Sequence, residues 1–185
     1  MLISYNGLVG LINRGVIDAD IANVNSSSID ITLGEELLIE VNPKFHNRSE
    51  IIDICEPDQT INTMKWVGGK GEPFILEPGQ CVLAASVETF NLPNHISAEY
   101  KLKSSMARNF LEHLNAGWCD AGWHGSKLTL ELKNLSQYHA LIIRPGMKIG
   151  QVVFFEHEEV PAEFSYAKRG QYNSDQSVQK SRGVK

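Results

Sequence analysis

The segment from residue 127 to residue 134 constrains the fold of this chain more than any other stretch. It reads K-L-T-L-E-L-K-N, so polar and apolar residues alternate strictly. Successive side chains of a β-strand point to opposite faces, and the alternation therefore predicts a half-buried strand. Leu128, Leu130 and Leu132 are expected on the buried face. Glu131 is expected on the other face, turned away from the core.

Two polar segments upstream of this strand carry candidate functional groups. Residues 103–108 read K-S-S-M-A-R, which places two hydroxyls between two cations where a short helix is expected to begin. The unpaired N–H groups of a helix start make this a candidate phosphate cradle. Residues 115–125 read N-A-G-W-C-D-A-G-W-H-G, and their glycines suit tight turns and close approach to a ligand. Each pattern also has a purely structural explanation, since serines often cap helices and an outward Glu is often only solvated.

Taken in this order, the segments resemble the superfamily of dCTP deaminases and trimeric dUTPases. The matching motifs include K-S-S-M-A-R and the loop and strand just described. Further matches are S-S-I-D-I-T-L-G at 27–34, E-P-G at 77–79, S-V-E at 86–88, L-P at 92–93 and R-P-G-M-K-I-G-Q at 144–151. They keep the family's order and cover nearly the whole chain. The resemblance implies a mainly β fold, a dUTPase-like distorted β-barrel or sandwich with one or two short helices.

Length and composition set outer bounds on the function. A chain of 185 residues fits one domain with a real core. No apolar stretch approaches the length of a membrane span, and the start lacks the pattern of a signal peptide. Cys55, Cys81 and Cys119 are odd in number and far apart, which fits reduced thiols in a cytoplasm. A net charge of −5 argues against a groove for a nucleic-acid polymer but not against a nucleotide. We therefore expect a cytoplasmic protein that binds neither membranes nor nucleic-acid polymers.

Periodicity predicts the remaining elements. Residues 4–17 are expected to form an amphipathic helix that begins at Ser4 and ends at Gly15. A second helix is expected over 105–114, where Met106, Phe110 and Leu114 would share a face. Strands are expected within residues 26–39, 74–88, 96–102, 126–134, 140–143 and 149–156. Residues 40–72, with Asn42-Pro43 as a breaker, are expected to form strands joined by long loops. Many short strands between Pro and Gly turns favour a barrel or sandwich.

The chain divides into a nucleotide-hydrolysing β domain, residues 1–164, and a polar tail, residues 165–185. The tail has too little apolar area to fold alone. One interpretation is a frayed terminus. The resemblance favours another, because residues 170–177 are similar to the family segment that closes over the triphosphate. It implies a flexible lid in which Tyr172 and Gln176 bind the substrate.

Any deamination by this chain is expected to be independent of zinc. Residues 157–159 match H-x-E, but the sequence has no C-x-x-C, and its histidines show no metal-ligand spacing. No G-x-S-x-G motif and no P-loop occur. We expect no metal ligands from the protein. Magnesium is the expected cofactor, bound through the triphosphate and water.

The resemblance implies a role for each group near the base. Glu131 would shuttle protons between a water, the ring nitrogen and the leaving amine, as one shielded carboxyl group can. Ser104 and the backbone carbonyl of Ala116 would hold that water, and Arg108 would orient the cluster. Preorganised dipoles of this kind can replace a metal ion.

The resemblance also implies how the triphosphate is handled. Lys103 and Ser105 would contact phosphates. The loop that contains Trp118 and Asp120 is more similar to the A-G-W-x-D-A-G loop of bifunctional dCTP deaminase–diphosphatases, which release dUMP, than to that of monofunctional enzymes. Asp120 would then activate a second water for attack at the α-phosphorus, and Trp118 would contact the substrate. Alternatively, Asp120 only stabilises its turn and Trp118 only packs.

The sequence departs from the family pattern at several positions. Lys103 replaces an Arg, Asn115 a Thr and Thr32 an Arg, and one extra residue between Gly125 and Leu128 predicts a β-bulge. Three alternatives therefore stay open: a monofunctional deaminase that yields dUTP, a dUTPase without deamination, and a non-catalytic nucleotide-binding regulator. The resemblance implies dCTP or dUTP as the bound nucleotide. It also implies a homotrimer with sites at subunit interfaces.

Overall fold

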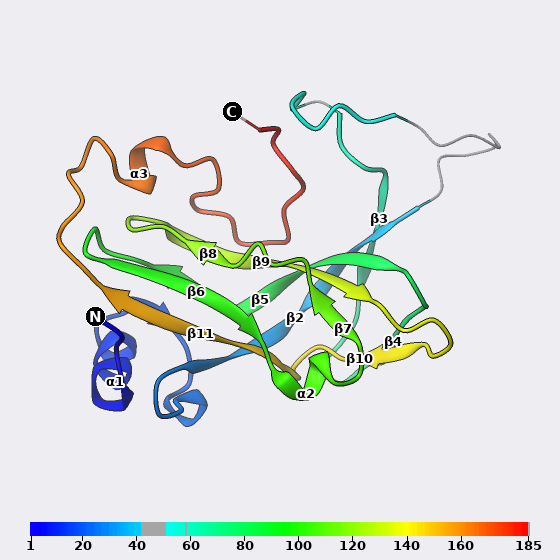
Figure 1. Cartoon of the computed structure of the whole chain (residues 1–185), viewed down its shortest axis with the longest axis horizontal. Coiled ribbons are helices and arrows are strands. Elements are labelled where there is room, and N and C mark those ends of the chain that lie inside the picture. The colour runs from blue at the N-terminus through cyan, green and yellow to red at the C-terminus, as the bar shows by residue number, and fades with distance from the viewer. Residues whose placement is uncertain (42–50, 58, 185) are drawn as a thin grey trace.

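A computed structural model describes residues 1–41, 51–57 and 59–184 (Figure 1). The expected turn at Asn42-Pro43 lies outside the described residues. The strands in chain order are β1 (Ile17–Asp18), β2 (Ile29–Glu40), β3 (Thr63–Val67), β4 (Phe74–Leu76), β5 (Cys81–Asn91), β6 (Ile96–Leu102), β7 (Leu111–His113), β8 (Trp118–Cys119), β9 (His124–Asn134), β10 (Leu141–Ile143) and β11 (Lys148–Glu156). The helices are α1 (Tyr5–Asn13), the 3₁₀ turn η1 (Ile21–Asn23), α2 (Ser104–Ala107) and α3 (Tyr166–Arg169).

Within the described residues, the fold is one large curled sheet with a small second one. The large sheet runs in the order β7-β9-β5-β2-β11-β6-β8, with β1 added at β5 and β3 at β2. All of its pairings are antiparallel, and β4 pairs with β10 in the second sheet. This arrangement confirms the mainly β fold that the sequence predicted. None of the described helices is long and apolar enough to cross a bilayer.

Strand β9 behaves as its alternation predicts. Leu128 is 7% exposed, and Leu130 and Leu132 are completely buried. The strand pairs with β5 on one side and β7 on the other. It ends at Asn134, whose buried amide donates to the carbonyls of Leu76 and His139, both at 2.9 Å. These two bonds fix the end of β9, because a buried amide left without partners would destabilise the fold by about 1–3 kcal/mol.

The expected bulge is present near Gly125. Phe90 pairs with Ser126 and Asn91 pairs with His124, so β9 has one residue more than β5 at this point. The extra residue is Gly125, whose φ of +63° lies in the left-handed region that favours glycine. The bulge therefore absorbs the additional residue before Glu131 without changing which face Glu131 occupies.

The predicted second helix over 105–114 is wrong. Helix α2 stops at Ala107, and residues 111–113 form β7, which pairs with the end of β9. The chain reverses at Phe110, which has a φ of +61° and a side chain that is 64% exposed. Pairing with β9 overrides the local apolar spacing, because it buries Leu111 and His113 instead of Phe110 and Leu114.

The first helix ends as expected but begins differently. Helix α1 buries Leu8 and Leu11 completely, and Gly15 follows its last residues with a φ of +71°. Ser4 is the N-cap residue, but its side chain makes no capping hydrogen bond. Helix α1 lies beside β11 at one end of the sheet (Figure 1), where Leu2 bridges to Phe155.

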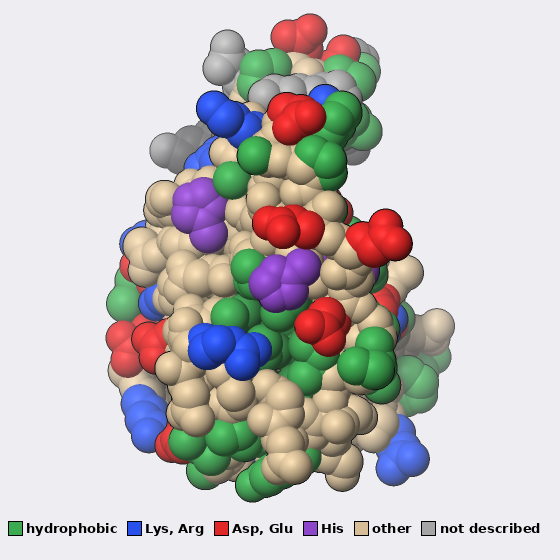
Figure 2. All heavy atoms as spheres, turned by 90° about the vertical axis from the view of Figure 1, so that its left-hand side faces the viewer, with side chains coloured by type: hydrophobic (Ala, Val, Ile, Leu, Met, Phe, Trp, Pro, Cys, Tyr) green, Lys and Arg blue, Asp and Glu red, His purple; other side chains and the backbone are tan. Residues whose placement is uncertain are grey.

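The face that includes the ends of β6 and β11 carries charges of both signs. Figure 2 shows Lys, Arg, Asp and Glu side chains interspersed there with hydrophobic groups and histidines. The mixed charge agrees with the low net charge of the chain.

Candidate active site

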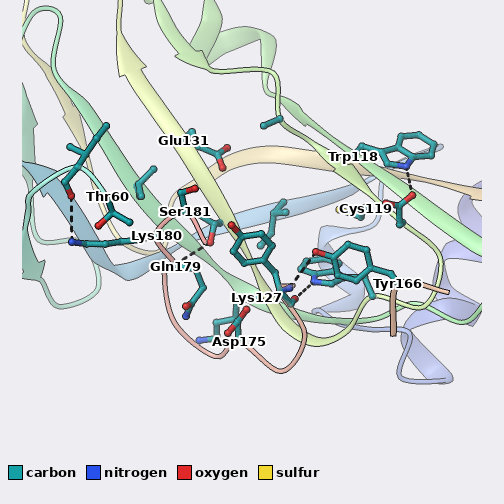
Figure 3. A pocket seen from close by; sticks show the side chains of 18 of the residues that line it. Thr60, Trp118, Cys119, Lys127, Glu131, Tyr166, Asp175, Gln179, Lys180 and Ser181 are labelled. Carbon is teal, nitrogen blue, oxygen red and sulfur yellow. Dashed lines mark hydrogen bonds between the residues drawn. The ribbon is translucent and has the colours of Figure 1, made fainter. Parts of the chain in front are cut away.

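A pocket with a volume of about 490 Å³ lies on the outer face of β9. Figure 3 shows the tail crossing in front of β9 and closing one side of the pocket. Five of the candidate site residues line it, namely Ala116, Trp118, Asp120, Glu131 and Tyr172. The other candidates, Lys103, Ser104, Ser105, Arg108 and Gln176, lie outside it. The fold therefore gathers half of the predicted set into one cavity.

Glu131 points into this pocket from the outer face of β9 (Figure 3). Its side chain is 27% exposed, and its Oε2 lies 3.1 Å from Nε2 of His113 on the neighbouring strand β7. The imidazole is only 4% exposed. A carboxyl group that is partly shielded but still open to the pocket can exchange protons with a bound ligand.

His113 and Tyr100 are polar neighbours of Glu131 that sequence reasoning did not identify. Their rings lie 4.5 Å apart between centroids, tilted at 53°. Burial, reinforced by the nearby charge of Glu131, raises the pKa of the Tyr100 phenol. Neither residue belongs to a recognisable motif. The only local signal was the alternation of Leu111 and His113, which the mistaken helix concealed.

The loop that holds Trp118 and Asp120 is internally bonded. The indole N–H of Trp118 donates to Asp120 Oδ1 at 2.9 Å, and the Trp118 ring stacks on Phe155 with centroids 6.2 Å apart. Asp120 thus has its carboxylate fixed by a side chain, while its backbone carbonyl accepts from the N–H of Trp123. Both side chains border the pocket.

Cys119 lies between these two residues but faces the interior. It is 4% exposed, and its thiol is not part of a disulfide. Burial, reinforced by the charge of Asp120, raises the pKa of Cys119 to about 12. The thiol therefore stays protonated at neutral pH.

Helix α2 presents its polar groups to solvent rather than to the pocket. Ser104, Ser105 and Arg108 are exposed. Within the described part of the chain, the Arg108 side chain makes no hydrogen bond and no ion pair. In Figure 1, α2 lies at the lower edge of the molecule and the tail near the top. The predicted phosphate cradle is thus exposed on the surface of a single chain.

Lys103 is held away from solvent by an ion pair. Its Nζ lies 2.5 Å from Oδ1 of Asp30, a β2 carboxylate that is 6% exposed. Asn25 donates to the same oxygen at 2.8 Å, and Lys148 Nζ lies 3.2 Å from Oδ2. Burial opposes ionisation of this carboxyl, but the three donors outweigh it and hold the pKa of Asp30 below its ordinary value.

The tail packs along the outer face of β9. The carbonyl of Tyr172 accepts from the Trp123 indole at 2.6 Å and from the Ser126 hydroxyl at 3.0 Å. Further on, the backbone N–H of Gln179 donates to the Thr129 hydroxyl. Tyr172 lines the main pocket. Gln176 instead donates to the Gly125 carbonyl and borders a second, smaller pocket of about 300 Å³.

Several pocket residues were not predicted. One wall is formed by Thr60, Ile61 and Thr63. Two cationic side chains, Lys127 and Lys180, complete the lining near the tail (Figure 3). The sequence before β3 offered no motif that would place these residues near Glu131, because only the long-range pairing of β3 with β2 brings them there.

The described residues hold no group of three or more His, Cys, Asp or Glu side chains placed to bind a metal ion. This donor set does not fit a zinc site, which takes three or four protein ligands. It fits magnesium held by phosphate oxygens, because that ion keeps most of its waters and needs only one or two carboxylates. Asp120 and Asp175 are two of the carboxylates that line the pocket, and they would accept hydrogen bonds from such waters.

Comparison with known proteins supports the resemblance seen in the sequence. A family model described as dCTP deaminase-like matches residues 8–157. A protein of Persephonella marina, named "dCTP deaminase, dUMP-forming", is 39% identical over 163 residues, which are 88% of this chain and 84% of that protein. A protein of the same name from Sulfurihydrogenibium sp. is 34% identical over 185 residues, with 98% and 97% coverage.

A solved structure confirms the fold. The 2'-deoxycytidine 5'-triphosphate deaminase of Agrobacterium tumefaciens aligns with a TM-score of 0.62 at 20% sequence identity. The alignment covers 83% of this chain and 47% of that one, so this chain spans about half the length of the solved chain. At this identity the likeness concerns the fold alone. The family model, by contrast, spans most of the chain, including β9 and the loop before it, and this chain therefore belongs to the dCTP deaminase-like family.

Proposed function

We propose that this chain deaminates dCTP at C4 of cytosine and then cleaves the α–β phosphate bond to release dUMP. The observation that carries the proposal is a single pocket with two separately held carboxylates, Glu131 beside His113 and Asp120 beside Trp118. Two hydrolytic steps at different atoms need two water-activating groups. Relatives named "dCTP deaminase, dUMP-forming" support the same pair of reactions.

In the first reaction, Glu131 is the proton shuttle. Its carboxylate takes a proton from water while the water oxygen attacks C4, and that proton passes to N3 of the ring. The remaining hydroxyl proton then moves through Glu131 to the exocyclic amine, the C4–N bond breaks, and ammonia leaves. Water and dCTP thus give dUTP and ammonia. The pocket's partly buried carboxylate suits these two transfers, because bulk solvent would otherwise compete for the proton.

In the second reaction, Asp120 accepts a proton from another water as its oxygen attacks the α-phosphorus. The bond to the bridging oxygen breaks, and pyrophosphate leaves. Magnesium, when bound through phosphate oxygens and water, supplies positive charge that stabilises the charge on the phosphates. Trp118 keeps one Asp120 oxygen occupied, so the other is directed to the water.

We further propose a homotrimer in which the α2 segment of a neighbouring subunit completes each site. The α2 hydroxyls and Arg108 do not line the pocket of their own chain, although the family resemblance assigns them to the water and the phosphates. The adjoining apolar side chains Phe110 and Leu114 are 64% and 51% exposed, which suits burial against another subunit. Closed cyclic symmetry would create identical sites at each interface.

The remaining assignments follow from this model of the site. Lys103 and Ser105 of the neighbouring subunit contact the phosphates of the nucleotide. Residues 165–185 act as a lid over the bound nucleotide, with Tyr172 and Gln176 as its substrate contacts. The three cysteines are unpaired, which suits action in a reducing cytoplasm.

Product analysis tests the proposal directly. With dCTP and magnesium, we expect dUMP, pyrophosphate and ammonia in equal amounts. Stoichiometric accumulation of dUTP would indicate a monofunctional deaminase. Cleavage of added dUTP without turnover of dCTP would indicate a dUTPase, and recovery of unchanged dCTP after tight binding would indicate a regulator.

A further inference from the structure

The contact between Glu131 and His113 leaves two buried polar atoms without an alternative partner. Glu131 Oε2 and His113 Nε2 are 3.1 Å apart. Both atoms are inaccessible to solvent, and neither makes a well-aligned hydrogen bond with any described residue, so their own contact is close but not yet aligned as a hydrogen bond. Each unpaired buried polar atom destabilises the fold by about 1–3 kcal/mol. Such a pair indicates a functional role rather than a packing role, because an apolar side chain would fill the same space without this penalty.

The fold fixes His113 relative to Glu131. Strand β7 pairs with β9, with His113 opposite Leu132, and the N–H of Leu114 donates to the Glu131 carbonyl at 3.1 Å. On its other side the imidazole packs against the Tyr100 ring. The ring therefore has little freedom to move, whereas the Glu131 side chain has three rotatable bonds and an open pocket before it.

We propose that His113 is the positioning residue of the deamination centre. Its Nε2–H holds Glu131 Oε2 at the back of the pocket and leaves Oε1 facing the water and the cytosine ring. A carboxyl group that makes two successive proton transfers needs one orientation throughout, and misplacement by about 1 Å reduces turnover up to about 100-fold. This role rests on the proposed function of Glu131.

Two amide substitutions separate positioning from packing. In His113→Gln the side-chain amide reaches the place of Nε2 and retains a donor for Glu131. In His113→Asn the amide ends near the place of Nδ1 and does not reach it. Both variants keep polarity, and both remove the aromatic contact with Tyr100. If His113 positions Glu131, the Gln variant keeps kcat for dCTP deamination within about threefold, and the Asn variant loses at least about tenfold.

The second activity serves as an internal control. Cleavage of dUTP uses Asp120, so the Asn variant should cleave dUTP within about twofold of the unsubstituted rate and keep KM for dCTP within about threefold. Equal losses in both activities, together with a lowered Tm, would overturn the proposal in favour of a packing role. So would equal deamination rates in the Gln and Asn variants.

A double-substitution cycle distinguishes failure of this inference from failure of the proposed function. In a Glu131→Gln background, His113→Asn should produce no further loss of deamination, because its effect passes through Glu131. If Glu131→Gln alone deaminates normally, the proposed function of Glu131 is wrong, whatever His113 does. The other outcome is that Glu131→Gln is impaired and His113→Asn lowers its residual rate by the same factor as in the unsubstituted protein. The role of Glu131 would then be supported, and the positioning role of His113 would be wrong.

Discussion

The candidate catalytic side chains on strand β9 and its preceding loop are held differently from those on the α2 segment. Glu131 and Asp120 each lie beside a fixed side chain inside a pocket of their own chain. Arg108, by contrast, follows the four-residue helix α2 as its C-cap and is exposed to solvent without a side-chain partner among the described residues. The pocket groups are preorganised before any ligand arrives, whereas the exposed side chains of Ser104, Ser105 and Arg108 are not.

In the proposed homotrimer, this difference would amount to a division of labour between subunits. Groups that transfer protons must be placed to within a fraction of an ångström, and a single folded chain supplies that accuracy through β-sheet pairing. A neighbouring subunit would contribute Lys103 and Ser105 to the phosphates, and its Ser104 and Arg108 would complete the water site only on assembly. The predictions below test this division, beginning with the largest expected effect.

Of the substitutions at pocket residues, Glu131→Gln should reduce deamination most. The substitution keeps the shape of the side chain and removes its basic oxygen, so ammonia release from dCTP should fall by at least about 100-fold. Cleavage of dUTP should continue. Near-normal ammonia release in an ammonia-coupled assay would contradict the role of Glu131 as proton shuttle. The contrast between a preorganised catalytic group in the pocket and the exposed groups of α2 would then have no basis.

Asp120→Asn should separate the two carboxylates of the pocket. The amide still accepts the hydrogen bond from Trp118, so the loop should retain its conformation. Loss of the basic oxygen should slow dUMP formation by at least about tenfold and make dUTP accumulate, while ammonia release changes less. Chromatography of the products over time measures both. Parallel loss of ammonia and dUMP would show that Asp120 serves both steps.

Truncation after Phe164 tests whether the tail belongs functionally to the pocket. The shortened chain loses the wall formed by Tyr172 and the residues after it, so we expect turnover to fall by about tenfold or more while the β domain stays folded. Activity and circular dichroism measure the two effects. Full activity in the truncated protein would make the tail a frayed terminus.

Mixed trimers test whether α2 acts across an interface. Arg108→Ala and Glu131→Gln are each expected to be inactive in deamination. After equal amounts are mixed and reassembled, about one site in four has both residues intact if each site takes one residue from each of two neighbours. Recovery of about a quarter of the original activity supports sharing. If both residues act within the same chain, mixing restores nothing.

Asp30→Asn should have the smallest effect of the substitutions considered, and the effect is on stability. It removes the ion pair that holds Lys103, the N-cap residue of α2. The ionised carboxyl holds Lys103 and Lys148, so its loss should reduce the free energy of unfolding by about 1–3 kcal/mol at pH 7. Because the pKa of Asp30 is lowered in the folded state, this stability is present above the ordinary pKa of 3.8 and is lost as pH falls through the folded value. Urea titrations of both proteins should therefore converge in acid, and a constant difference down to pH 2 would contradict the ion pair.

The sequence predicted the parts of the site that follow from local periodicity. The alternation around Glu131 was enough to place its side chain outside the leucine face, and the extra residue near Gly125 was enough to predict a bulge. The predicted helix over 105–114 failed because pairing of β7 with β9 is a long-range interaction that local spacing does not record. His113 was missed for the same reason.

The low reactivity of the buried Cys119 thiol has a practical consequence for chemical labelling of the protein. Alkylating reagents and peroxide attack thiolates, and a pKa of about 12 leaves almost none at Cys119 at neutral pH. Cys55 is exposed. A maleimide dye should therefore attach at Cys55, and more slowly at the half-buried Cys81, and leave the loop around Asp120 unmodified. The same burial should protect the Cys119 thiol itself from oxidation by peroxide.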